Sequence, residues 1–141
     1  MGLRGLPLAV LFVACAATPA RVQVDREAAL ALGQRAVFHA ARNCEVLFER
    51  VVEDGRCPRG RECAASNPVR VRVQITCAGS ARTEELAVLD RDVGEPRMQG
   101  VRSCAPIDGA VLRLRDVTPY PGSSTERTRA VLVVEGRCGG P

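Results

Sequence analysis

Residues 69–77 read VRVRVQITC, and this stretch decides the fold. Its apolar side chains occupy every odd-numbered position, and its polar side chains occupy the positions between them. A period of two places alternate side chains on opposite faces of a β-strand. The segment therefore predicts a strand with one buried face and one solvent-facing face.

Other segments carry the same alternation or a short buried run. Strands are predicted at 22–24, 35–40, 44–52, 84–89, 110–117 and 129–135 as well as 69–77. Residues 26–33 instead predict one or two helical turns, because Gly33 would end a helix early. Residues 90–109 show no period and predict a surface loop tethered by Cys104. About seven short strands with Pro- and Gly-rich connections predict an all-β, antiparallel, disulfide-stapled β-sandwich over residues 22–138.

Composition supports one small folded domain. The chain has 141 residues, 46% of them hydrophobic and 26% charged, which argues against disorder. Only 3% are aromatic, so the predicted core is thin and would benefit from covalent staples. No apolar run approaches the ~20 residues of a membrane-spanning helix.

The N-terminus resembles an export signal. Arg4 precedes an apolar stretch and then small residues, and residues 12–15 (FVAC) are similar to a bacterial lipobox. We expect residues 1–14 to be a signal peptide, Cys15 to be acylated, and residues 15–21 to form a short tether. Cleavage after Ala16 or Ala20 is the alternative and would discard Cys15. The expected location is the cell envelope, lipid-anchored at the outer membrane or periplasm, or else secretion.

Cysteine parity fits export under both cleavage schemes. The chain has seven cysteines, and removing or acylating Cys15 leaves an even set: Cys44, Cys57, Cys63, Cys77, Cys104 and Cys138. Such a set allows fifteen pairings. Cys57–Cys63 is favoured because Pro58 and Gly60 form a turn between them.

Strand pairing favours the other two bridges. Placing Val52 opposite Val69 in an antiparallel pair would bring Cys44 opposite Cys77. Pairing strands 110–117 and 129–135 would bring Cys104 and Cys138 to a common end.

Two motifs resemble a family of uncharacterised small exported bacterial β-sandwich lipoproteins. Residues 48–63 (FERVVEDGRCPRGREC) are similar to its D-S-R-C-P-x₄-C-x-W-x-G signature, and residues 114–121 (LRDVTPYP) to its L-x-x-V-x-P-x-P ending. The chain departs from the signature at Gly55, Ala65 and Asn67, where the family has Ser, Trp and Gly. The resemblance implies export, a β-sandwich and the Cys57–Cys63 bridge, and it transfers no catalytic residue.

No pattern in the chain predicts catalysis or a cofactor. His39 is the single histidine, there is no lysine, and no nucleophile or phosphate-loop motif is present. The cysteine spacing does not match a zinc site. Residues 90–95 (DRDVGE) lack the further oxygen ligands of a calcium loop. We therefore expect no enzyme activity, metal or cofactor.

Arginines mark the candidate binding surface. Arg56, Arg59 and Arg61 lie in the charged turn that Cys57 and Cys63 would clamp. If their strands were neighbours in one sheet, one patch for an anionic glycan, lipid headgroups or an acidic protein would form from Arg70, Arg72, Arg113 and Arg115. The alternative is a set of solvated charges balanced by nearby acids. Nucleic acid is not an expected partner, because acids interrupt the arginines and stacking aromatics are scarce.

These observations predict a non-catalytic cell-envelope lipoprotein domain with a binding or structural role. The alternative is an inhibitor or chaperone-like partner of an envelope enzyme, acting through residues 53–67, which the Cys57–Cys63 bridge would restrain. The expected partners are the membrane, through the lipid anchor, and an envelope protein or anionic glycan.

Overall fold

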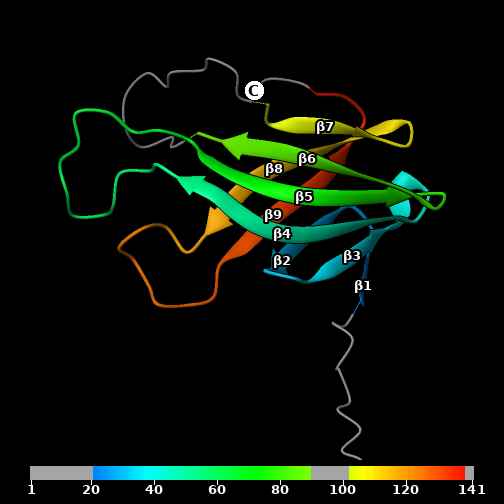
Figure 1. Cartoon of the computed structure of the whole chain (residues 1–141), viewed down its shortest axis with the longest axis horizontal. Coiled ribbons are helices and arrows are strands. Elements are labelled where there is room, and N and C mark those ends of the chain that lie inside the picture. Colours follow the sequence, from blue (N-terminus) through cyan, green and yellow to red (C-terminus); the bar gives the residue numbers. More distant parts are fainter. Residues whose placement is uncertain (1–20, 90–101, 139–141) are drawn as a thin grey trace, which may run out of the picture.

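The computed structural model describes residues 21–89 and 102–138 (Figure 1). The predicted signal peptide, Cys15 and the acidic residues 90–95 lie outside the described residues. No helix in the described part is long and apolar enough to cross a membrane.

The described residues form two β-sheets, and the predicted all-β class is confirmed. The strands are β1 (Arg21–Val24), β2 (Glu27–Ala31), β3 (Arg35–Phe38), β4 (Cys44–Asp54), β5 (Val69–Cys77), β6 (Ser80–Val88), β7 (Cys104–Ile107), β8 (Ala110–Thr118) and β9 (Arg129–Glu135), with one short 3₁₀-helix, η1 (His39–Ala41). One sheet has the order β1-β3-β4-β5-β6 and the other β2-β9-β8-β7. Figure 1 shows the two sheets packed over each other. All strand pairs are antiparallel except β1 with β3, which run parallel.

Two strands lie where the sequence predicts none. Residues 27–31 form β2 rather than a helical turn, because Ala28 and Leu30 alternate into the core while the backbone pairs with β9. Residues 104–107 form β7 inside the stretch predicted as a loop. The helix prediction for 26–33 is therefore wrong, and the described residues form nine strands rather than about seven.

The core confirms the alternation that predicts the fold. Val69, Val71, Val73 and Ile75 are all fully buried, while the polar residues between them face outward. They pack with the two core phenylalanines, Phe38 and Phe48, and with aliphatic side chains of β8 and β9. Each sheet therefore contributes one apolar face to a shared interior.

Two β-bulges in β4 change the predicted register with β5. Near the cysteines Glu45 lies opposite Thr76, as the prediction requires. The register then shifts twice along β4, so Asp54 rather than Val52 lies opposite Val69. The extra residues leave the Cys44 end unaffected and bring Asp54 to the end of the ladder.

Three disulfides brace the sandwich. Their pairs are Cys44–Cys77, Cys57–Cys63 and Cys104–Cys138, the same pairs that the sequence favours. The first joins β4 to β5, the second closes the loop between them, and the third joins β7 to the chain after β9. Three disulfides in one small domain are typical of an oxidising, extracytoplasmic compartment.

Candidate functional site

The candidate site lies where two loops meet at one end of the sandwich. We call residues 55–68, between β4 and β5, the clamped loop, and residues 119–128 the β8–β9 loop. Both project from the left end of the molecule in Figure 1. The Arg59 amide donates a hydrogen bond of 3.0 Å to the Pro121 carbonyl. Gly122 lies beside the clamped loop, so that a Cβ there would be in ordinary van der Waals contact with the Arg59 backbone at 3.5 Å.

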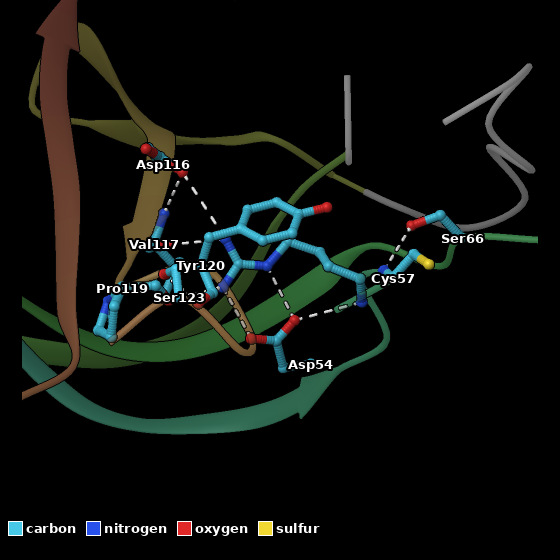
Figure 2. Close-up of polar contacts among 9 residues, drawn as sticks. Asp54, Cys57, Ser66, Asp116, Val117, Pro119, Tyr120 and Ser123 are labelled. Atoms are coloured by element: carbon cyan, nitrogen blue, oxygen red, sulfur yellow. Dashed lines mark hydrogen bonds and ion pairs between the residues drawn. The ribbon is translucent and has the colours of Figure 1, made fainter. Parts of the chain in front are cut away.

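Arg56 joins the two loops through a buried guanidinium. Its side chain is only 3% exposed. Nε and Nη2 donate to the two carboxylate oxygens of Asp54 at 2.8 and 2.7 Å, which is a bidentate pair. Nη1 donates to the Val117 carbonyl at 2.6 Å, and Nη2 also reaches the Pro119 carbonyl at 3.4 Å. Figure 2 shows Asp54 on one side of this network and Val117 and Pro119 on the other.

The surroundings of Arg56 keep it charged. Burial by itself would lower the pKa of the guanidinium, but the Asp54 hydrogen bond and the charges of Asp54 and Asp116 outweigh burial and raise the pKa above its usual value. Asp116 lies 3.8 Å from Nη1. The Tyr120 ring covers the guanidinium, with its centroid 4.9 Å away. The buried charge is therefore compensated on several sides.

Hydrogen bonds also close the base of the clamped loop. Gly55 and Asn67 continue the ladder beyond β4 and β5, because the Asn67 amide donates to the Gly55 carbonyl at 2.9 Å. The Cys57 amide donates to Ser66 Oγ at 3.1 Å, as Figure 2 shows. A Cβ at Gly55 would meet the Asn67 Cβ at 2.5 Å, which is too close for both side chains. The chain therefore needs glycine at one of these two positions.

The tip of the clamped loop carries exposed charge. Arg59, Arg61 and Glu62 are all exposed. The Arg59 guanidinium lies 5.3 Å from the Tyr120 centroid, so Arg56 and Arg59 both contact this ring. Across residues 21–89 and 102–138, neither Arg59 nor Arg61 has a carboxylate within ion-pair distance. Arg56 itself is buried and does not belong to the exposed surface predicted for it.

The four strand arginines do not form one patch. Arg70 and Arg72 lie on β5, whereas Arg113 and Arg115 lie on β8 in the other sheet. Alternation predicts which face of a strand is polar but not which sheet the strand joins. Each has a glutamate partner, in the pairs Arg70–Glu53, Arg72–Glu85, Arg113–Glu135 and Arg115–Glu27. The Arg72 hydrogen bond lowers the pKa of Glu85 below its usual value.

Away from these two loops, the described residues offer few candidates for a catalytic, metal or ligand site. His39 Nδ1 lies 2.8 Å from Asn43 Oδ1 on the surface. No three His, Cys, Asp or Glu side chains come close enough to hold a metal in the described part of the chain. A shallow hollow of about 430 Å³ lies on the outer face of the five-stranded sheet, at the end opposite the clamped loop. Its carboxylate, Glu45, already pairs with Arg21 and Arg35 at 2.6 and 2.7 Å.

No family model, curated protein or solved structure matches this chain. The resemblance to small exported lipoproteins stays a prediction. The two motifs of this resemblance contain the residues of the Arg56 network, although nothing in the sequence predicts that those residues meet. Asp54 and Arg56 occupy the Asp and Arg positions of the first motif, and Pro119 and Tyr120 lie in the second. The two motifs meet in space at Arg56.

Proposed function

We propose that this chain is a non-catalytic, exported binding domain of the cell envelope, lipid-anchored through Cys15. In this proposal the clamped loop is the part that meets a partner. The observation that supports it is the Arg56 network, in which a buried guanidinium pairs bidentately with Asp54 and donates to two carbonyls, and so fastens an exposed loop to a second loop. A loop ordered before it binds loses less conformational entropy on association.

Site-specific cross-linking in the native cell envelope tests the role of the loop. A photo-crosslinking amino acid replaces Glu62 at the tip, and in a matched control it replaces the exposed Thr83 on β6. We expect one envelope protein to be captured from position 62 and not from position 83. Equal capture from both positions, or none from position 62, contradicts the proposal.

An inhibitor or chaperone-like partner of an envelope enzyme is the second candidate function. It is favoured by the rigid bracing of the tip, since the Cys57–Cys63 bridge and the Arg59–Pro121 hydrogen bond both restrain it. If the protein captured from position 62 is an enzyme, its purified form should lose activity, or gain folded yield, when the oxidised domain is added. No effect on either would leave the simple binding role.

The absence of catalysis and the lipid anchor each have a direct test. Metal-independent hydrolytic turnover by the purified protein, lost in His39→Ala, would contradict a non-catalytic role. Mass spectrometry of the mature protein should find an acylated Cys15 at its N-terminus. An unmodified N-terminus at Ala17 or Arg21 would contradict lipid anchoring.

A further inference from the structure

Among the described residues, the exposed arginines differ in whether a carboxylate lies within ion-pair distance. Outward-facing strand arginines such as Arg70, Arg72 and Arg115 each have a glutamate carboxylate at 2.6–2.8 Å. At the tip of the clamped loop, Arg59 and Arg61 have no such partner in the described part of the chain, although Glu62 is adjacent in sequence. Arg50 on β4 and Arg129 on β9 also have no carboxylate within ion-pair distance in the described part of the chain, so unpaired positive charge lies both on these two strands and at the tip.

The tip arginines are held in place rather than left on a free loop. Arg59 is fixed by its amide hydrogen bond to Pro121 and by its contact with the Tyr120 ring. The Arg61 amide donates to the Pro58 carbonyl at 3.2 Å, which closes a tight turn. Gly60 supplies the positive φ of +78° within that turn, and the Cys57–Cys63 bridge closes it covalently. The Arg59 side chain and the backbone at Arg61 are therefore held on a braced turn, and guanidiniums are well suited to binding carboxylates.

We propose that Arg59, Arg61 and Tyr120 form a recognition surface for acidic side chains of a partner protein. This inference rests on the proposed function and adds the chemistry of the partner. A projecting turn fits a cleft of another protein, and tyrosine and arginine are the residues that most often dominate protein interfaces. An anionic glycan would fit a hollow better, and the polar hollow described above lies at the opposite end of the sandwich.

Titration with a defined acidic peptide tests the surface. Hexaglutamate is added to the oxidised, ¹⁵N-labelled protein at about 25 mM and about 250 mM salt, since screening weakens exposed charge interactions. We expect shifts of the Arg59 and Arg61 Nε–H signals and the Tyr120 amide, weaker at high salt. Arg59→Ala/Arg61→Ala should lower the affinity at least about tenfold. The matched control Arg70→Ala/Arg72→Ala removes the same charge from paired arginines and should bind as the parent does.

Four outcomes would overturn the inference. Equal loss of affinity in both double variants would show a response to net charge alone. Unchanged binding in Arg59→Ala/Arg61→Ala would show that the tip is not the site. Tighter binding of an oligogalacturonate than of hexaglutamate at the same residues would assign the surface to a glycan. Capture from position 62 that persists in Arg59→Ala/Arg61→Ala would leave the proposed function standing and defeat only this inference.

Discussion

The Arg56 guanidinium meets two carboxylate oxygens and two carbonyl oxygens from segments far apart in the chain. Its position follows from local chemistry only in part. Asp54 is two residues away, so a local ion pair is predictable from the sequence. The burial of Arg56 is not predictable, because it depends on Val117, Pro119 and Tyr120, which belong to β8 and the loop after it. Arg56, which in the sequence resembles a solvated turn residue, is therefore buried in the structure.

Arg56→Met should lower the free energy of unfolding by about 2 kcal/mol, because it removes the hydrogen bonds of a buried guanidinium to the partly exposed Asp54 carboxylate and to two carbonyls. Arg115→Met is the matched control, since Arg115 also pairs with a carboxylate at 2.8 Å but is 52% exposed. That variant should lose less than about 1 kcal/mol. Urea unfolding of the oxidised proteins measures both. Equal losses would mean that the Arg56 network contributes no more than a surface pair.

Gly55 and Asn67 should be energetically coupled. Gly55→Ser alone should cost about 1–3 kcal/mol, because its Cβ would lie 2.5 Å from the Asn67 Cβ. Adding Asn67→Gly should recover most of that loss, and it would produce the Ser and Gly of the family signature that the chain resembles. A double-mutant cycle by urea unfolding measures the coupling. Additive effects at the two positions would refute the contact.

Glu85 should titrate below the usual range of glutamate. Its folded-state pKa is lowered, so any stabilisation it contributes is present above the unfolded pKa and is lost as pH falls through the folded value. Carboxyl ¹³C NMR should show the pKa of Glu85 rising in Arg72→Ala, because the hydrogen bond is removed. Arg113→Ala, in the other sheet, should leave it unchanged. A Glu85 pKa that ignores Arg72→Ala would contradict the pairing.

At the scale of elements, alternation predicts strands well where one face is buried. β5 is predicted with its observed ends, and the Cys44–Cys77 bridge is present, although Asp54 rather than the predicted Val52 lies opposite Val69. β2 and β7 are four or five residues long, and they form because β9 and β8 offer them partners. Such short segments carry too little local pattern to predict pairing with distant strands. The bulges of β4 carry no local sequence signal, so the residue of β4 that lies opposite Val69 is not predictable from alternation.

The two β4–β5 disulfides should differ in their effect on stability. On the chain-entropy view, the seven-residue loop of Cys57–Cys63 contributes about 2.4 kcal/mol and the much longer Cys44–Cys77 loop about 3.8 kcal/mol. Replacing each pair by alanines and measuring urea unfolding should therefore show a larger loss for Cys44→Ala/Cys77→Ala. A larger loss for Cys57→Ala/Cys63→Ala would instead make the clamped loop a principal source of stability.

On the scale of the whole molecule, the domain combines a thin core with covalent bracing. Its core has two phenylalanines and otherwise aliphatic or small side chains. Three disulfides brace it: one joins β4 to β5, one lies within the clamped loop, and one joins β7 to the chain after β9. The sequence predicts this combination, because the number of cysteines and the content of aromatic residues can be counted without knowing the fold. The site is less predictable, since it forms only where two distant loops meet.

If the Arg56 network acts as proposed, Arg56 holds the clamped loop rigid before any partner binds. Backbone ¹⁵N relaxation of the oxidised, unbound protein tests it most directly. We predict order parameters of about 0.85 for residues 58–66, as in the strands, and a clear fall for the same residues in Arg56→Met. Order parameters below about 0.6 in the parent protein, or no change in Arg56→Met, would contradict the account.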